Sequence, residues 1–174
     1  VIAALKERGL WDSKARSRIP RLSRRKVLES QPNQQREERS AAALAIWQST
    51  ISAVGTPVET YLSARSLNLS PPPSLRFLRG LKHPSGGLWP AMIALVTRGS
   101  DGTPLAIHRT FLSHDGSAKA PIDPNKMMLG PCRGGAVRLG DAGNVLLVGE
   151  GIETCLSATQ ATGHPAWAAL STSG

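Results

Sequence analysis

The residues best suited to chemistry are two carboxylates near the end of the sequence. Glu150 stands between Gly149 and Gly151, directly after the apolar run 145–148, and Glu153 follows three residues later. The small glycines would allow a phosphate or a metal ion to approach the backbone closely. Two neighbouring carboxylates can share a divalent cation or raise one another's pKa for acid/base work. The alternative is an ordinary glycine turn in which Glu153 only complements the positive end of a helix.

Two basic residues form a second candidate set. Arg109 follows His108 in a strand-like run, and Lys119 lies beyond the turn at Asp115–Gly116. Cations that share one face of a sheet would suit a phosphate backbone. Isolated surface charges are the alternative explanation, because most charged side chains of a folded protein lie in solvent.

The two carboxylates depend on a β-α-β unit for their position. The apolar run 145–148 predicts a strand buried on both faces of a sheet. Residues 152–162 predict a helix ended by Gly163, and residues 167–170 predict a second strand, parallel to the first. Open α/β sheets place their sites at the carboxyl ends of such strands, where Glu150 lies.

The upstream part of the sequence predicts helices and then strands. Apolar residues at 3-4-3 spacing over 44–54 predict an amphipathic helix. A second helix, over about 57–65, would begin after Thr56 as its N-cap. Residues 74–140 predict a small antiparallel or mixed sheet with a hairpin turn at 99–102. Its strands are expected at residues 91–96, 105–112, 127–129 and 136–139.

These elements place the chain in the α/β class, with an α+β N-terminal part. The expected organisation is a basic helical and linker segment broken at Pro20 and Pro32, a helical segment, a mixed α/β subdomain and the start of a further domain. These four parts are residues 1–40, 41–70, 71–143 and 144–174. The last part is expected to be truncated, because two parallel strands alone cannot bury both of their faces.

The 174-residue chain is strongly basic, and its charge is unevenly placed. The formal net charge is +9, and residues 1–40 hold 11 Lys and Arg against 5 Asp and Glu. Clustered cations release counterions from a phosphate backbone, so nucleic acid is the expected partner of this segment. A solvated linker whose charges only maintain solubility would explain the same pattern.

Several protein classes are excluded by motifs that the sequence lacks. No apolar stretch approaches the roughly 20 residues of a membrane span, and no Walker A motif is present. The four histidines and two cysteines show no zinc-ligand spacing, and no Gly-x-Ser-x-Gly motif marks a nucleophilic serine. Two cysteines are too few for a disulfide scaffold, which favours a cytoplasmic location.

The segment Leu147–Thr154, which contains Gly-Glu-Gly-Ile-Glu, resembles the opening of a Toprim domain, the module shared by topoisomerases and DnaG-type DNA primases. Upstream, Leu105–Arg109 and the Lys119 segment are similar to motifs that precede this domain in those primases. Downstream, Ala168–Thr172 is similar to its second strand and polar loop. The resemblance spans residues 56–174 and is greatest to primases and primase–helicases of phages and plasmids. A co-linear set of this kind is more specific than a lone motif.

The resemblance implies an enzyme that makes short RNA primers on single-stranded DNA from NTPs. It allows for a replicative helicase as a further partner and involves no membrane. Glu150 is implied to act in nucleotidyl transfer, with Arg109 and Lys119 contacting template or nucleotide phosphates. Glu150 and Glu153 would hold Mg²⁺ or Mn²⁺, which stabilises charge on the transferring phosphate.

The sequence departs from this family pattern in three places. Glu153 stands where many of these primases have an aspartate, no D-x-D motif follows it, and the zinc-binding module that often precedes the core is absent. Zinc is therefore expected only in a module upstream of Val1, and residues 1–174 alone are expected to be inactive. A non-catalytic DNA-binding module and a Toprim nuclease are the alternative functions.

Overall fold

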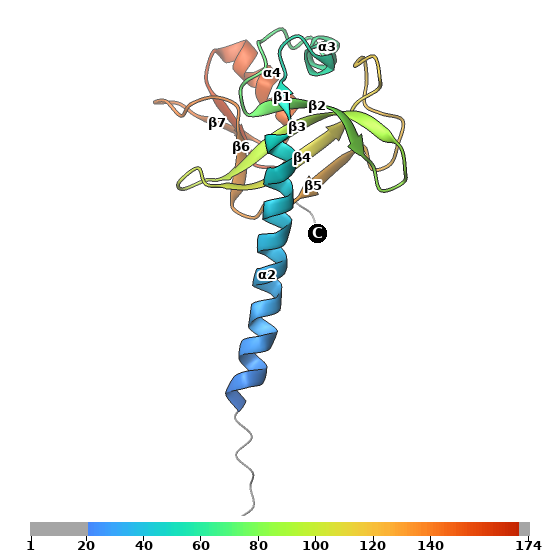
Figure 1. The fold of residues 1–174 in the computed structure, drawn as a ribbon. Coiled ribbons are helices and arrows are strands. Elements are labelled where there is room, and N and C mark those ends of the chain that lie inside the picture. The colour runs from blue at the N-terminus through green and yellow to red at the C-terminus, as the bar shows by residue number, and fades with distance from the viewer. Residues whose placement is uncertain (1–20, 171–174) are drawn as a thin grey trace, which may run out of the picture. The chain divides into compact units, whose positions relative to one another are not determined.

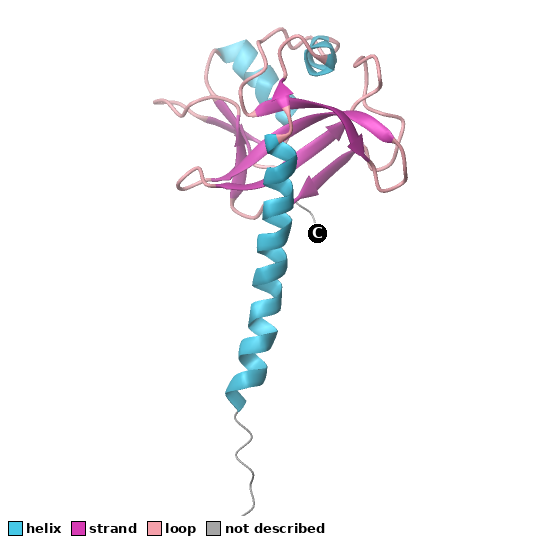
Figure 2. Ribbon diagram, viewed as in Figure 1, coloured by secondary structure: helices cyan, strands magenta, loops and turns pink. Residues whose placement is uncertain are grey.

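The computed structural model describes residues 21–170 and divides the chain into two compact units, Val1–Gln34 and Gln35–Gly174. The described part of the first unit is helical, and the second unit holds a mixed eight-stranded sheet with helices (Figure 2). The described residues therefore form a mixed helix and sheet structure of the α+β kind. The helices are α2 (Arg21–Gln48), α3 (Pro57–Ser63) and α4 (Ile152–Thr162). The strands are β1 (Ile51–Ser52), β2 (Leu75–Lys82), β3 (Leu88–Arg98), β4 (Pro104–Phe111), β5 (Lys126–Leu129), β6 (Gly135–Arg138), β7 (Leu147–Gly149) and β8 (Ala166–Ala168). No helix in this part of the chain is both long and apolar enough to cross a membrane.

The sheet is antiparallel except at one end. Its main path runs β1-β2-β3-β6-β8-β7, while β4 pairs with β3 and carries β5 on its other side. Strands β7 and β8 are parallel, and α4 connects them (Figure 1). The predicted β-α-β unit and the mixed sheet before it are therefore both confirmed.

The long strand β3 separates two apolar clusters, because successive side chains point to opposite faces of a sheet. Met92, Ala94 and Val96 lie in the cluster that also contains Tyr61 of α3 and Ile152 of α4. We call this side the α4 face. Alternate residues of β3, with Ile93 among them, lie in a second cluster together with Ala43 of α2, and we call that side the α2 face.

Two helix ends form as the local sequence predicts. The Thr56 hydroxyl accepts a hydrogen bond from the Val58 amide at 3.3 Å, and Pro57 follows as the first helical residue. The Glu59 carboxylate reaches back and accepts a bond from the Gly55 amide at 2.8 Å. At the other helix, Gly163 ends α4 in the left-handed conformation, with φ 73°, which glycine adopts without steric cost.

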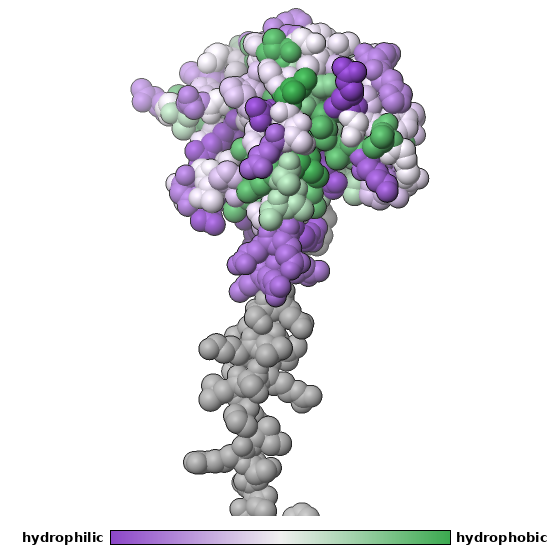
Figure 3. Space-filling model, in the orientation of Figure 1, coloured by the Kyte–Doolittle hydropathy of each residue, from purple (hydrophilic) through white to green (hydrophobic). Residues whose placement is uncertain are grey.

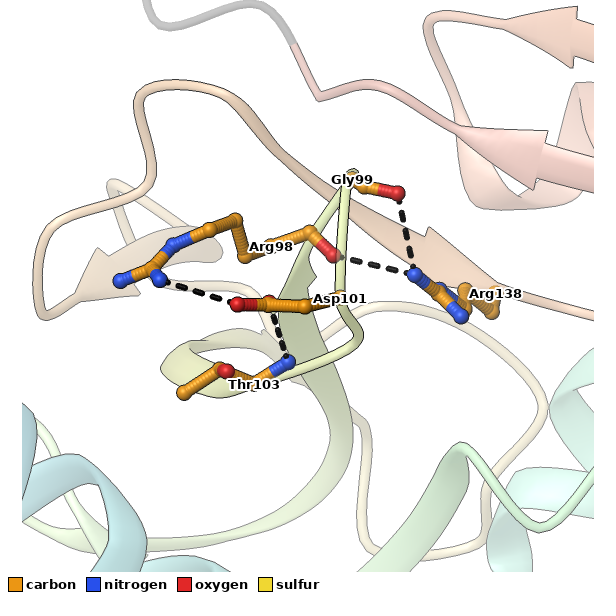
Figure 4. A network of polar contacts seen from close by, with 5 residues as sticks. All are labelled: Arg98, Gly99, Asp101, Thr103 and Arg138. Atoms are coloured by element: carbon orange, nitrogen blue, oxygen red, sulfur yellow. Dashed lines mark hydrogen bonds and ion pairs between the residues drawn. The ribbon is translucent and has the colours of Figure 1, made fainter.

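The hairpin between β3 and β4 turns at residues 99–102, as predicted (Figure 4). The Asp101 carboxylate accepts hydrogen bonds from the Thr103 amide at 3.0 Å and from the Arg98 guanidinium at 3.1 Å. Arg138 of β6 donates to the carbonyls of Arg98 and Gly99, at 3.0 and 3.1 Å. These bonds tie the hairpin turn to the neighbouring strand.

Three expectations about individual elements are wrong. The helix predicted to reach residue 54 ends at Gln48, because Ile51 instead pairs with Phe77 between β1 and β2. The same helix continues through Pro32, where a break was expected. The run 145–148 is not a strand buried on both faces, because β7 is the last strand of the sheet and the Val148 side chain is 68% exposed. The expectations for residues 1–20 and 171–174 lie outside the described residues.

Candidate functional site

A pocket of about 340 Å³ lies at the carboxyl end of the parallel strand pair. Its walls come from β4, β5 and the turn between β7 and α4. The residues that line it are His108, Lys126, Met127, Met128, Glu150, Gly151, Ile152 and Leu170. This position agrees with the rule that open α/β sheets bind ligands beyond the carboxyl ends of their parallel strands.

Glu150 is exposed and lines this pocket, directly after β7. The glycine before it has a packing role. A Cβ atom at Gly149 would come within 2.8 Å of the Cys155 sulfur on α4, which is closer than real contacts allow. Gly151 is the N-cap of α4 and has no side chain with which to cap it. The turn therefore packs α4 closely against β7 and places Glu150 at the N-terminal end of α4.

Glu153, in the first turn of α4, is engaged by two other segments of the chain. Its Oε1 accepts hydrogen bonds from the Tyr61 hydroxyl at 2.7 Å and from Lys126 Nζ at 2.9 Å. Its Oε2 is 3.1 Å from the same ammonium group. Burial favours a higher pKa for Glu153, but the bonds from Tyr61 and Lys126 outweigh it and lower the pKa to about 2. Burial, and then this bond to Glu153, raise the pKa of Tyr61.

This arrangement bears on the expected metal site. Among the described side chains, residues 33–170, no group of three or more His, Cys, Asp or Glu could hold a metal ion. Both oxygens of Glu153 contact the Lys126 ammonium, so that carboxylate is balanced by a cation of the chain itself. The magnesium site expected at Glu150 and Glu153 therefore stays a prediction, with Glu153 held by Lys126 in this structure.

Lys126 is the cation of the pocket, and the sequence analysis did not single it out. It pairs with Thr110 between β4 and β5, which places its side chain on the α4 face. The ammonium group has three N–H donors. Nothing in the local sequence marks it, since it only begins the short apolar run of β5. The β4–β5 pairing is what brings it to Glu153.

His108 forms the inner wall of the pocket and is only 9% exposed. Burial, and then the charge of Lys126, lower its pKa to about 4. The ring is therefore neutral at neutral pH. Its Nδ1 is buried and has no hydrogen-bond partner among the described residues.

The two predicted cations lie on opposite faces of the sheet. The backbone of Lys119 forms an isolated antiparallel β-bridge with that of Leu112, and the Leu112 side chain belongs to the α4-face cluster. Burial, and then the charge of Lys126, lower the pKa of Lys119. Arg109 instead pairs with Ile93 and Met127, which belong to the α2 face.

Arg109 is held on the α2 face by a hydrogen bond. Its Nη2 donates to the Met128 carbonyl at 3.2 Å, while its buried Nε has no hydrogen-bond partner in the described chain. Burial, and then the charge of Arg39 on α2, lower its pKa. The structure thus brings Lys119 into the electrostatic surroundings of Glu153 and Lys126, and it turns Arg109 away from them.

Comparison with known proteins yields one match. Residues 37–139, which are more than half of the chain, match the family model described as Domain of unknown function (DUF7146). No curated protein and no solved structure matches. The matched region contains His108, Lys119 and Lys126, and it ends before Glu150.

Proposed function

Because this chain belongs to the DUF7146 family, which has no assigned activity, we propose a function from its pocket: nucleotide binding and primase-type nucleotidyl transfer on single-stranded DNA. The observation that supports it is that Glu150 and Lys126 line the same pocket at the end of the parallel strand pair. The resemblance of residues 147–154 to a Toprim domain supports the same assignment. The reaction would take place in the cytoplasm, with DNA and NTPs as partners.

In the proposed reaction, the two lysines bind phosphate and Glu150 handles a proton. Lys126 keeps a third N–H donor beyond its two contacts with Glu153, and it can direct this donor at a nucleotide phosphate. Lys119 adds a second positive charge on the same face. The attacking hydroxyl oxygen forms a bond to the α-phosphorus, pyrophosphate leaves, and the hydroxyl proton passes to the Glu150 carboxylate. Mg²⁺ or Mn²⁺, expected at Glu150 and Glu153, remains an expectation from the resemblance.

The test is NTP incorporation on single-stranded DNA by the native protein that carries this sequence. Glu150→Gln should lower primer synthesis by roughly 100-fold or more, since it removes a proton acceptor and keeps the side chain's size. Glu37→Gln, at an exposed position of α2, is the matched control and should prime normally. Normal priming by Glu150→Gln would refute the catalytic assignment.

A non-catalytic DNA-binding module is the second candidate. The net charge of +9 favours it, because a strongly cationic chain binds a phosphate backbone without a catalytic site. In that case, binding to single-stranded DNA should weaken steeply with salt and be unaffected by Glu150→Gln, and no nucleotide should be incorporated. Strand cleavage without incorporation would instead indicate the Toprim nuclease.

A further inference from the structure

A second hollow, of about 490 Å³, lies where α2 ends beside β1 and β2. We call it the Trp47 groove, and its lining differs throughout from that of the Glu150 pocket. The described residues that line it are mostly apolar, and they include Trp47, Val54, Leu75 and the rigid run Pro71–Pro73. Figure 3 shows hydrophobic residues gathered on the face of the second unit that carries the end of α2 and β1.

One polar feature gives this groove a chemical preference. Arg76 of β2 lies with its guanidinium carbon 4.9 Å from the centre of the Trp47 ring. Among the described lining residues, Arg76 is the charged one, so the groove presents an aromatic ring, a guanidinium plane and a positive charge together. Trp47 also packs against the α2-face cluster, which fixes the ring in place.

We propose that the Trp47 groove binds a nucleotide unit of single-stranded nucleic acid, with its base stacked on the Trp47–Arg76 pair. Bases stack on aromatic rings and on guanidinium planes alike, so a base can extend a stack that already exists. The positive charge of Arg76 complements the adjoining phosphate. The three prolines form a wall that loses little conformational entropy when a ligand binds.

The charge favours this occupant over an apolar peptide or a second copy of the chain. A second copy would bring its own net charge of +9 to a groove that already carries Arg76. A nucleic acid supplies flat apolar bases and negative phosphates in one molecule. The inference rests on the proposed function for the identity of its ligand, single-stranded DNA, but it does not require catalysis.

The test is binding of the 174-residue chain to two fluorescent probes by polarisation. One is an oligothymidine of about 15 nucleotides, and the other has the same sugar-phosphate backbone without bases. The intact chain should bind the first probe more tightly, because stacking adds to the phosphate contacts. Trp47→Leu should weaken oligothymidine binding by about tenfold and remove the difference between the probes, whereas Trp47→Phe should keep most of it.

Three further variants make the outcome decisive. Arg76→Gln, which leaves Trp47 in the core cluster, should weaken binding of both probes and reduce the salt dependence by about one phosphate contact. Leu88→Ser removes an exposed apolar side chain that does not line the groove and should leave DNA binding unchanged. Glu150→Gln should also leave the preference for bases intact, which separates failure here from failure of the proposed catalysis.

Equal binding of the two probes by the intact chain would overturn the inference, as would an unchanged affinity in folded Trp47→Leu. A dimer seen by light scattering that Trp47→Leu dissociates, with DNA binding unaltered, would assign the groove to a second copy instead. If a peptide binds in a way that depends on Val54, and neither Trp47→Leu nor Arg76→Gln changes DNA binding, the groove would be assigned to a protein partner.

Discussion

The antiparallel centre of the sheet and the parallel unit at its end are stabilised in different ways. Strands β3 and β4 pair over seven residue pairs and bury Ile93 and Ile107 completely. Strands β7 and β8 pair over three, and Val148 of β7 remains 68% exposed. The parallel unit instead depends on α4, whose Glu153 is bonded to Tyr61 and Lys126 in other segments. The centre is stabilised mainly by apolar burial, and the end that carries the pocket relies on polar contacts as well.

The largest expected difference between the two regions is their response to loss of apolar side chains. Ile93→Ala in the centre should lower the free energy of unfolding by about 2–5 kcal/mol, because it leaves a cavity in a fully buried site. Val148→Ala in β7 should change it by no more than about 0.5 kcal/mol. Urea denaturation of both variants measures the effect. Equal losses would mean that apolar burial supports the two regions alike.

The second largest effect is expected from acid, which should lower the free energy of unfolding through His108 and Glu153. The pKa of His108 is lowered from 6.5 to about 4, so the unfolded chain binds a proton between these values that the folded chain does not. Stability from neutral His108 is complete above pH 6.5 and is lost as the pH falls towards 4. Glu153, with a pKa of about 2 against 4.5, adds a second loss between pH 4.5 and 2.

The acid effect can be measured as the free energy of unfolding against pH. The loss assigned to His108 is on the order of 3 kcal/mol, and His108→Gln should remove the slope between pH 6.5 and 4. His164→Gln, at an exposed position after α4, serves as the matched control and should keep that slope. A slope that survives in His108→Gln would move the titration to another group.

The smallest expected effect concerns the hydrogen bond between Tyr61 and Glu153. Tyr61→Phe removes the hydroxyl that donates to Glu153 and leaves the buried ring in place, so it should cost about 1 kcal/mol. In Glu153→Gln the same substitution should cost less, because the charged acceptor is gone. Thermal unfolding of the two single variants and the double variant gives this coupling energy. Additive losses would show that Tyr61 and Glu153 do not stabilise each other.

Features set by neighbouring residues could be predicted from the sequence. Thr56 and Pro57 start α3, Gly163 ends α4, and the hairpin turns at 99–102, because capping and turn geometry depend on a few adjacent residues. The mixed character of the sheet and the parallel β-α-β unit also follow from patterns of this length. Glu150 was correctly expected at the carboxyl end of a strand for the same reason.

Features that depend on pairing between distant segments could not be predicted from the sequence. Helix α2 stops at Gln48 because Ile51 pairs with Phe77 of β2, a partner that helical spacing does not show. Val148 is exposed because β7 lies at the end of the sheet, and the strand order alone determines that. Lys126 enters the pocket through the register of β4 and β5, while the same register turns Arg109 to the other face.

The junction between β3 and β6 joins the centre of the sheet to the strands that carry the parallel unit. These strands pair over only two residue pairs, Thr97 with Ala136 and Arg98 with Gly135, reinforced by the Arg138 bonds to the hairpin turn. Few hydrogen bonds oppose local opening at such a seam. In hydrogen exchange, the amides of β7 and β8 should therefore exchange as one early-opening unit, while those of β3 and β4 stay protected until the whole domain unfolds. The pocket, lined by β4 and β5 on one side and by the turn between β7 and α4 on the other, would then have a wall in each of the two regions.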